Sequence, residues 1–244
     1  MLTNNAAQHL YEDLSQRYQL EWADIQIGQI KLQLLQIANL ESYLVENIEA
    51  QNLSVENFPF WAMVWDGALV LADFLVKQPP QPDRTILELG AGLGFAGLAA
   101  AARGHRVTIT DNITDALAFA RLSAWQNHLT NVQVEYLDWQ NPLVTGQFSW
   151  LVGSDILYEP TSFAPLLQIF GNYLQPGGKI YLTQGIRGTG PQAFFELAKP
   201  LYQVRFQEKK VRQAEGDKKI LFFELTPKEE VGRLSVNRKH QKNS

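Results

Sequence analysis

The chain has 244 residues, of which 45% are hydrophobic and 19% charged, and a formal net charge of -4. This length and composition are typical of one globular domain with short additions. The absence of cysteine excludes disulfides, zinc-thiolate sites, iron-sulfur clusters and thiol nucleophiles. We predict no metal site, no signal peptide, no membrane contact and no nucleic-acid partner, and we expect a cytoplasmic protein.

Residues 1–57 are predicted to form an extension that contains a helix and a β-hairpin. Apolar residues recur at helical spacing over 6–18, and apolar and polar residues alternate on both sides of Gly28 in LEWADIQIGQIKLQLLQI. A second helix is predicted over 58–76, in FPFWAMVWDGALVLADFLV. It ends at the three prolines of KQPPQPD.

From residue 84 onward, short apolar strands alternate with helical patterns, which is typical of a doubly wound α/β fold with a mostly parallel sheet. Strands are expected at 85–89, 106–110, 132–137, 150–157 and 179–184, and helices at 95–104, 113–128 and 163–174. One more helix is expected after Gly190, followed by an antiparallel hairpin over 202–226. The main domain is therefore predicted over 58–227, followed by a basic, disordered tail over 228–244.

A glycine-rich turn follows the first strand of this domain, in ILELGAGLGFAG. Gly92-x-Gly94-x-x-Gly97 matches the dinucleotide fingerprint by itself, which favours a nicotinamide or flavin enzyme. However, no lysine or arginine near the turn is available to bind a phosphate. A different kind of cofactor therefore has to be considered.

Acidic residues recur where the predicted parallel strands end, which is the edge where open α/β sheets bind ligands. These acids are Glu88, Asp111, Asp138 and Asp155. S-adenosylmethionine carries a sulfonium, an ammonium and a carboxylate but no phosphate, so an acidic edge favours it over a dinucleotide. The glycines would let the backbone approach its amino acid moiety. Asp111 would accept hydrogen bonds from the ribose hydroxyls, and Asp138 from the adenine amino group.

The motifs ILELGAGLGFAG, VTITD and LQPGGKIYLT resemble those of the seven-strand, class I S-adenosylmethionine-dependent methyltransferases over about 84–226. This resemblance implies a Rossmann-like sheet that closes with an antiparallel hairpin. PFWAMVWDGALVLADFL, YLDW and GSDILYEP resemble a narrower branch, the protein-lysine methyltransferases with an Asp-x-x-Tyr motif.

That narrower resemblance implies roles for individual residues. Asp155 and Tyr158 would face the acceptor amine as catalytic residues, and Trp65 would lie against the cofactor. Asp138 and Trp139 would line its adenine end. The complete predicted cofactor-binding set is Trp65, Glu88, Gly90, Gly92, Gly94, Asp111, Asn112, Asp138, Trp139 and Ser154.

Three other functions stay open at this point. A small-molecule N- or O-methyltransferase would share the cofactor half and differ in its acceptor pocket. A nicotinamide-linked oxidoreductase has only the glycine fingerprint in its favour, and an inactive binding module would keep the fold alone. Trp61 and Trp65, four apart on the predicted helix, are also compatible with core packing, and His105 and His128 are expected at the surface or at helix ends.

Overall fold

The computed structural model describes residues 2–49, 58–186, 190–213 and 216–228. Its first elements are a helix, α1 (Asn4–Ser15), and the predicted hairpin of β1 (Leu20–Ile27) and β2 (Ile30–Ile37). Gly28, with φ of 58°, makes the tight turn between the two strands. The helix that follows, α2 (Leu40–Glu49), is not among the predicted elements.

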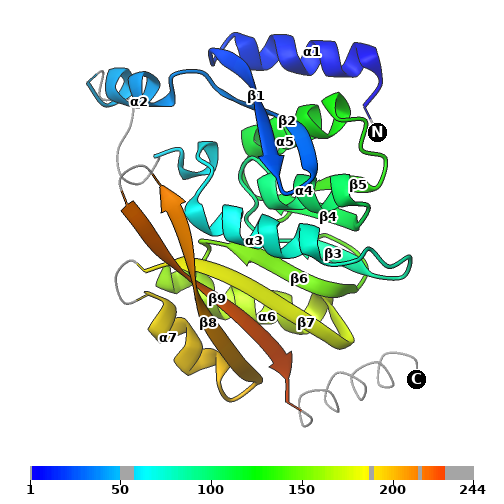
Figure 1. Ribbon diagram of the computed structural model, residues 1–244, viewed down its shortest axis with the longest axis vertical. Coiled ribbons are helices and arrows are strands. Elements are labelled where there is room, and N and C mark those ends of the chain that lie inside the picture. Colours follow the sequence, from blue (N-terminus) through cyan, green and yellow to red (C-terminus); the bar gives the residue numbers. More distant parts are fainter. Residues whose placement is uncertain (1, 50–57, 187–189, 214–215, 229–244) are drawn as a thin grey trace.

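The main sheet has seven strands in the order β5-β4-β3-β6-β7-β9-β8 (Figure 1). Its strands are β3 (Thr85–Glu88), β4 (Arg106–Asp111), β5 (Val132–Tyr136), β6 (Phe148–Ser154), β7 (Leu174–Gly185), β8 (Tyr202–Gln213) and β9 (Gly216–Pro227). Strands β3 to β7 pair in parallel, and β9 is antiparallel to both of its neighbours. The predicted doubly wound sheet with a closing antiparallel hairpin is therefore confirmed.

Helices cover both faces of this sheet, because successive apolar side chains of its strands point to opposite faces. They are α3 (Asp66–Lys77), α4 (Phe95–Arg103), α5 (Thr114–Gln126), α6 (Phe163–Tyr173) and α7 (Gly190–Ala198), with short 3-10 turns at Phe60–Ala62 and Pro160–Ser162. Ile86 of β3 belongs to the core shared with α3, α4 and α5, whereas its neighbour Leu87 belongs to the core shared with α6 and α7. Successive side chains thus enter opposite cores.

The N-terminal hairpin forms a further layer outside α4 and α5 (Figure 1). Leu34 and Leu35 of β2 are fully buried in the same core as α3 and α4. The backbone N–H of Leu35 donates to Ser123 Oγ at 3.0 Å, and the Asn127 side chain bonds both the N–H and the C=O of Gln33. Polar and apolar contacts together fix the extension to α5.

The prediction of one continuous helix over 58–76 is wrong in its first part. A 3-10 turn occupies Phe60–Ala62, and α3 begins only at Asp66, because Trp65 has an extended backbone with ψ of 153°. The Trp61 ring packs against Tyr18 and Phe119, at centroid distances of 6.0 and 5.4 Å. Packing against these two residues, distant in the chain, therefore replaces the helical geometry that the local pattern indicated.

The predicted tail over 228–244 lies outside the described residues, except for Lys228. Among the residues that are described, no helix is long and apolar enough to span a bilayer, and no group of three or more histidine or acidic side chains is placed to hold a metal ion.

Candidate active site

The strand order reverses between β3 and β6, and the carboxyl edge at such a switch point is where open α/β sheets bind ligands. The loop after β3 is the glycine turn. Gly90, Gly92 and Gly94 have φ of 58°, 55° and 75°, a region that side chains other than glycine rarely adopt. A Cβ on Gly92 would lie 2.8 Å from the Trp61 carbonyl oxygen. The turn is thus held beneath the segment that precedes α3.

Glu88 lies under the glycine turn rather than on its open side. Its side chain is 1% exposed, and Oε2 accepts a hydrogen bond of 3.0 Å from the N–H of Gly97 in α4. Burial raises the pKa of Glu88 to about 8. The geometry gives this carboxyl a supporting position, fixing α4 to the end of β3, and its predicted contact with a cofactor stays a prediction.

Asp111 ends β4 and bonds the glycine turn directly. Its Oδ2 accepts from the N–H of Gly92 at 2.8 Å, and its Oδ1 accepts from the N–H of Ile113 at 2.9 Å. Burial raises the pKa of Asp111, and these N–H donors oppose the shift. A carboxylate has about four acceptor sites, so Asp111 can still accept a further hydroxyl donor.

Asp138 and Trp139 follow β5 at the same edge. Asp138 Oδ1 accepts from the N–H of Gln140 at 2.9 Å, and its side chain is partly exposed. The Trp139 ring lies against the glycine turn, since a Cβ on Gly90 would be 3.4 Å from its Cζ2. Asn112 is exposed after Asp111, and Ser154 is partly exposed at the end of β6. Of the two residues predicted at the adenine end, Trp139 therefore lies against the glycine turn.

Trp65 belongs to a group of aromatic side chains that also contains Phe60 and Tyr158. Its Nε1 donates to the Phe60 carbonyl at 2.9 Å, and the two rings are 6.2 Å apart. Phe60 is in turn 6.5 Å from Tyr158, and both rings are exposed, by 43% and 68%. Large exposed aromatic rings of this kind form a surface able to receive an aliphatic or cationic side chain.

Asp155 begins the Asp-x-x-Tyr turn and connects three elements. Its carboxylate accepts from the N–H of Gly67 in α3 at 3.0 Å and from the N–H of Gly185 at the end of β7 at 2.8 Å. Its own N–H donates to the Thr183 carbonyl, and its φ is 53°. This carboxylate therefore has a structural function whatever its part in catalysis.

Beside Asp155 lies a cleft of about 320 Å³, between the start of α3 and the start of β9. Asp66, Gly185, Ile186, Lys218 and Ile220 also line it. Lys218 Nζ forms an ion pair of 3.2 Å with Asp66. Sequence reasoning did not identify Gly67, Gly185 or Lys218, because their only signal is a contact between segments far apart in the chain.

The residues at this edge fit S-adenosylmethionine. Segment 88–97 has no basic side chain, three glycines in it have positive φ, and the buried carboxylate of Asp111 accepts from the turn itself. A dinucleotide would bring two phosphates to a place where only backbone N–H groups are available to balance their charge. A ligand with ribose hydroxyls, an ammonium group and no phosphate matches this donor and acceptor set.

Comparisons with known proteins agree with this geometry. A family model described as Lysine methyltransferase matches residues 60–200, more than half of the chain. Protein N-lysine methyltransferase METTL21A of Xenopus tropicalis is 34% identical over 144 residues, covering 57% of this chain and 66% of that protein. Histone-arginine methyltransferase METTL23 of Rattus norvegicus is 29% identical over 140 residues, covering 54% and 62%. The chain thus spans about two thirds or less of the length of these relatives.

A solved structure of similar fold is precorrin-6y C5,15-methyltransferase from Geobacter metallireducens. It aligns with a TM-score of 0.53 and 13% identity over 66% of this chain and 87% of that one. This likeness bears on the fold alone, whereas the family model bears on the segment that carries the glycine turn and the Asp155 turn. The chain belongs to the lysine methyltransferase family, and the predicted class I methyltransferase fold and S-adenosylmethionine cofactor are confirmed.

Proposed function

We propose that the protein transfers a methyl group from S-adenosylmethionine to the side-chain nitrogen of a lysine in another protein. The observation that carries this proposal is the position of the Asp155–Tyr158 turn. It lies at the switch point beside the glycine turn, in a chain whose residues 60–200 match the lysine methyltransferase family. The relative METTL21A is named as a protein N-lysine methyltransferase.

In the proposed reaction, the cofactor supplies an electrophilic methyl group, and the lysine nitrogen displaces its sulfur in line. The amine must arrive with its lone pair free, so the protein has to align it and let a proton leave to water. Asp155 places a negative charge at the cleft, which attracts the incoming ammonium. The exposed Tyr158 ring, next to Phe60, offers the side chain an aromatic face.

Several finer assignments belong to the same proposal. Asp111 holds the ribose, the glycine turn holds the amino acid moiety, and Trp65, Asn112, Asp138, Trp139 and Ser154 complete the cofactor site. Glu88 acts by holding the turn. We assign residues 58–227 to the catalytic domain, 1–57 to an extension and 228–244 to a tail. The partner is a protein rather than a nucleic acid, and the enzyme works in the cytoplasm.

The test is transfer of label from tritiated S-adenosylmethionine to the proteins of a cell extract. Labelled protein is hydrolysed, and methylated lysines are separated from methylated arginines, because one relative is named for histone arginine. We expect the label in methyl-lysine. Label only in methyl-arginine, or only in small molecules, would contradict the proposed acceptor.

A variant ties the transfer to the predicted cofactor site. Asp111→Ala removes a charged acceptor worth about 1.5 to 3 kcal/mol. Its affinity for the cofactor should fall by roughly one to two orders of magnitude in calorimetry. Lys31→Ala, an exposed change on β2, serves as the control and should leave the affinity unchanged. An unaltered dissociation constant in a folded Asp111→Ala protein would give Asp111 a purely structural role.

A further inference from the structure

Strands β8 and β9 extend as a two-stranded ribbon beyond the rest of the sheet. Pairing between β7 and β9 ends at Gly185 and Ile220, whereas β9 continues to pair with β8 back to Gly216. Gly185 is the carboxyl end of β7. The ribbon therefore projects past the same edge of the sheet that carries Asp111 and Asp155, beside the proposed acceptor cleft.

This ribbon is basic, although the chain as a whole is acidic. Segment 205–219 has six basic and three acidic residues, against a net charge of -4 for the chain. Lys210 lies directly opposite Lys219, a pairing of like charges that costs stability. Among the described residues, Lys209, Lys210 and Arg212 are exposed and form no ion pair. A concentration of unpaired positive charge is thus maintained next to the active site.

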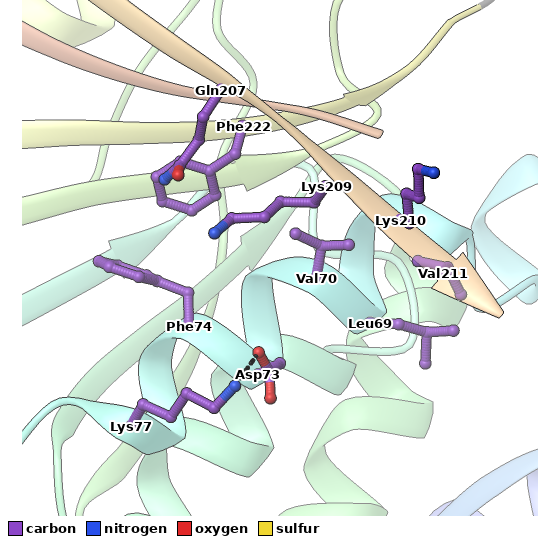
Figure 2. A pocket seen from close by; sticks show the side chains of 10 residues that line it. All are labelled: Leu69, Val70, Asp73, Phe74, Lys77, Gln207, Lys209, Lys210, Val211 and Phe222. Carbon is purple, nitrogen blue, oxygen red and sulfur yellow. Dashed lines mark hydrogen bonds and ion pairs between the residues drawn. The ribbon is translucent and has the colours of Figure 1, made fainter. Parts of the chain in front are cut away.

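A groove of about 310 Å³ runs between α3 and the same ribbon (Figure 2). Its floor is apolar and includes Leu69, Val70, Phe74 and Phe222. Figure 2 shows Lys209 extending over the groove between Phe222 and Val70. Lys77 also lines the groove but is paired with Asp73 at 2.6 Å. The groove is thus apolar below and positively charged above.

The edge strand supplies a third feature. Within the described residues, β8 pairs with β9 alone, so its other side presents backbone N–H and C=O groups. Lysines on an edge strand also protect sheets from pairing with one another. That protective function, however, requires no apolar groove beneath the lysines. The groove and the acceptor cleft contact the same ribbon and the same helix, since Asp66 begins α3 and Leu69 lies one turn later.

From these observations we infer that the α3/β8 groove docks an extended segment of the protein substrate that carries both acidic and apolar residues. Acidic side chains of that segment meet Lys209 on the groove face of β8 and Lys210 and Arg212 on its opposite face, and apolar ones enter the groove. Main-chain pairing to β8 orients the segment so that its target lysine enters the cleft at Asp155. This inference rests on the proposed function and names the chemistry by which the enzyme selects its substrate.

The test measures binding separately from catalysis. The probe is a fluorescein-labelled peptide of about ten residues, a length that spans one strand. Pairs of glutamates in it are separated by leucine and valine, so that both faces of the strand carry glutamate. A matched peptide carries glutamine in place of glutamate. Fluorescence anisotropy compares the parent protein, Lys209→Glu, Lys209→Gln and Lys31→Glu. The last variant reverses one exposed charge on β2, away from the groove.

We expect the parent to bind the acidic peptide more tightly than the glutamine peptide, and more weakly as salt rises. Lys209→Glu should weaken this binding about fivefold, Lys209→Gln should weaken it less, and Lys31→Glu should leave it within about twofold. The acidic peptide should also inhibit label transfer to extract proteins by the parent. Thermal unfolding of each variant verifies that β8 is intact.

Three results would overturn the inference. The first is no binding of the acidic peptide by the parent, and the second is equal binding by all four proteins. The third is tighter, Lys209-dependent binding of a single-stranded RNA of the same charge, which would make the ribbon a nucleic-acid surface. Because anisotropy needs no methyl transfer, a parent that binds the peptide but labels no protein would contradict the proposed function and leave the docking surface supported.

Discussion

Glu88 carries a buried carboxyl group directly beneath the glycine turn. Because burial raises its pKa to about 8, the folded protein keeps a proton there that the unfolded chain releases near its ordinary value of 4.5. The free energy of unfolding should therefore fall as pH rises from about 5 to about 8, by at most about 1.4 kcal/mol per pH unit. Glu88→Gln keeps an acceptor for the Gly97 N–H but does not titrate.

Urea unfolding across this pH range tests the effect. The stability of Glu88→Gln relative to the parent should increase with pH. Glu196→Gln, on the surface of α7, should stay within about 0.5 kcal/mol of the parent throughout. A constant difference between Glu88→Gln and the parent would mean that the carboxyl is ionised in the folded state.

His105 was expected at the surface or at a helix end, and the expectation of surface exposure is wrong. The residue follows the end of α4 but is fully buried, with Nε2 at 3.2 Å from the carbonyl oxygens of Leu75 and Gln78. Nε2 donates to these acceptors, and Nδ1 has no hydrogen-bond partner. Burial lowers the pKa of His105 below its ordinary value of 6.5.

Acid should consequently destabilise the protein through His105. Below about pH 6.5 the unfolded chain takes up a proton that the folded protein excludes. The free energy of unfolding therefore decreases as the pH is lowered. His105→Gln retains an N–H donor for the end of α3 without titrating. Its thermal midpoint should depend less on pH between about 6.5 and about 4.5 than that of the parent. Parallel pH profiles would refute this role.

At the scale of elements, the Asp155 turn depends on the close approach of α3. Gly67, in the first turn of α3, donates to the Asp155 carboxylate, and Thr183 of β7 donates to the Gly67 carbonyl at 2.8 Å. A Cβ at Gly67 would lie 2.2 Å from Asp155 Oδ2. Glycine is required here because a side chain would have no space. Its backbone conformation is that of an ordinary helix and does not itself require glycine.

Gly67→Ala should therefore displace Asp155 and reduce methyl transfer about tenfold or more, as expected when a polar group loses its alignment. Gly171→Ala in α6 is the matched control, because a Cβ there meets nothing within 4 Å. That change should preserve transfer and raise stability by about 0.5 to 1 kcal/mol. Label transfer at saturating cofactor measures both variants. Full activity in Gly67→Ala would show that the position of Asp155 is not limiting.

At the scale of the whole molecule, the N-terminal hairpin is part of the main core. Leu35 is fully buried among residues shared with α3 and α4, although it lies in the predicted extension. Leu35→Ala should lower the free energy of unfolding by about 2 to 5 kcal/mol, with one cooperative transition. Lys31→Ala, on the same strand but exposed, should change it by less than about 0.5 kcal/mol. A separate early transition for the hairpin would indicate an independent unit.

Local sequence pattern predicted most of the elements because their physical causes are local. Alternation about Gly28 indicated the N-terminal hairpin, and apolar runs followed by acids indicated the parallel strands. Segment 58–65 departed from its helical pattern because its geometry depends on Tyr18 and Phe119, which lie far away in the chain. His105 was misjudged for the same reason, since its partners are carbonyls at the end of α3.

The sequence by itself determined the fold class, the glycine turn and the acids that end the strands, because strand periodicity and positive φ at glycine are properties of short segments. Only the tertiary structure decided which groups each of those acids contacts. Glu88 and Asp111 both end strands, yet one is enclosed beneath α4 and the other bonds the turn at the edge. Tertiary structure also created the contacts of Asp155 with Gly67 and Gly185 and the basic groove along β8. These features depend on distances between segments far apart in the chain, and pairing and packing of the whole sheet set those distances.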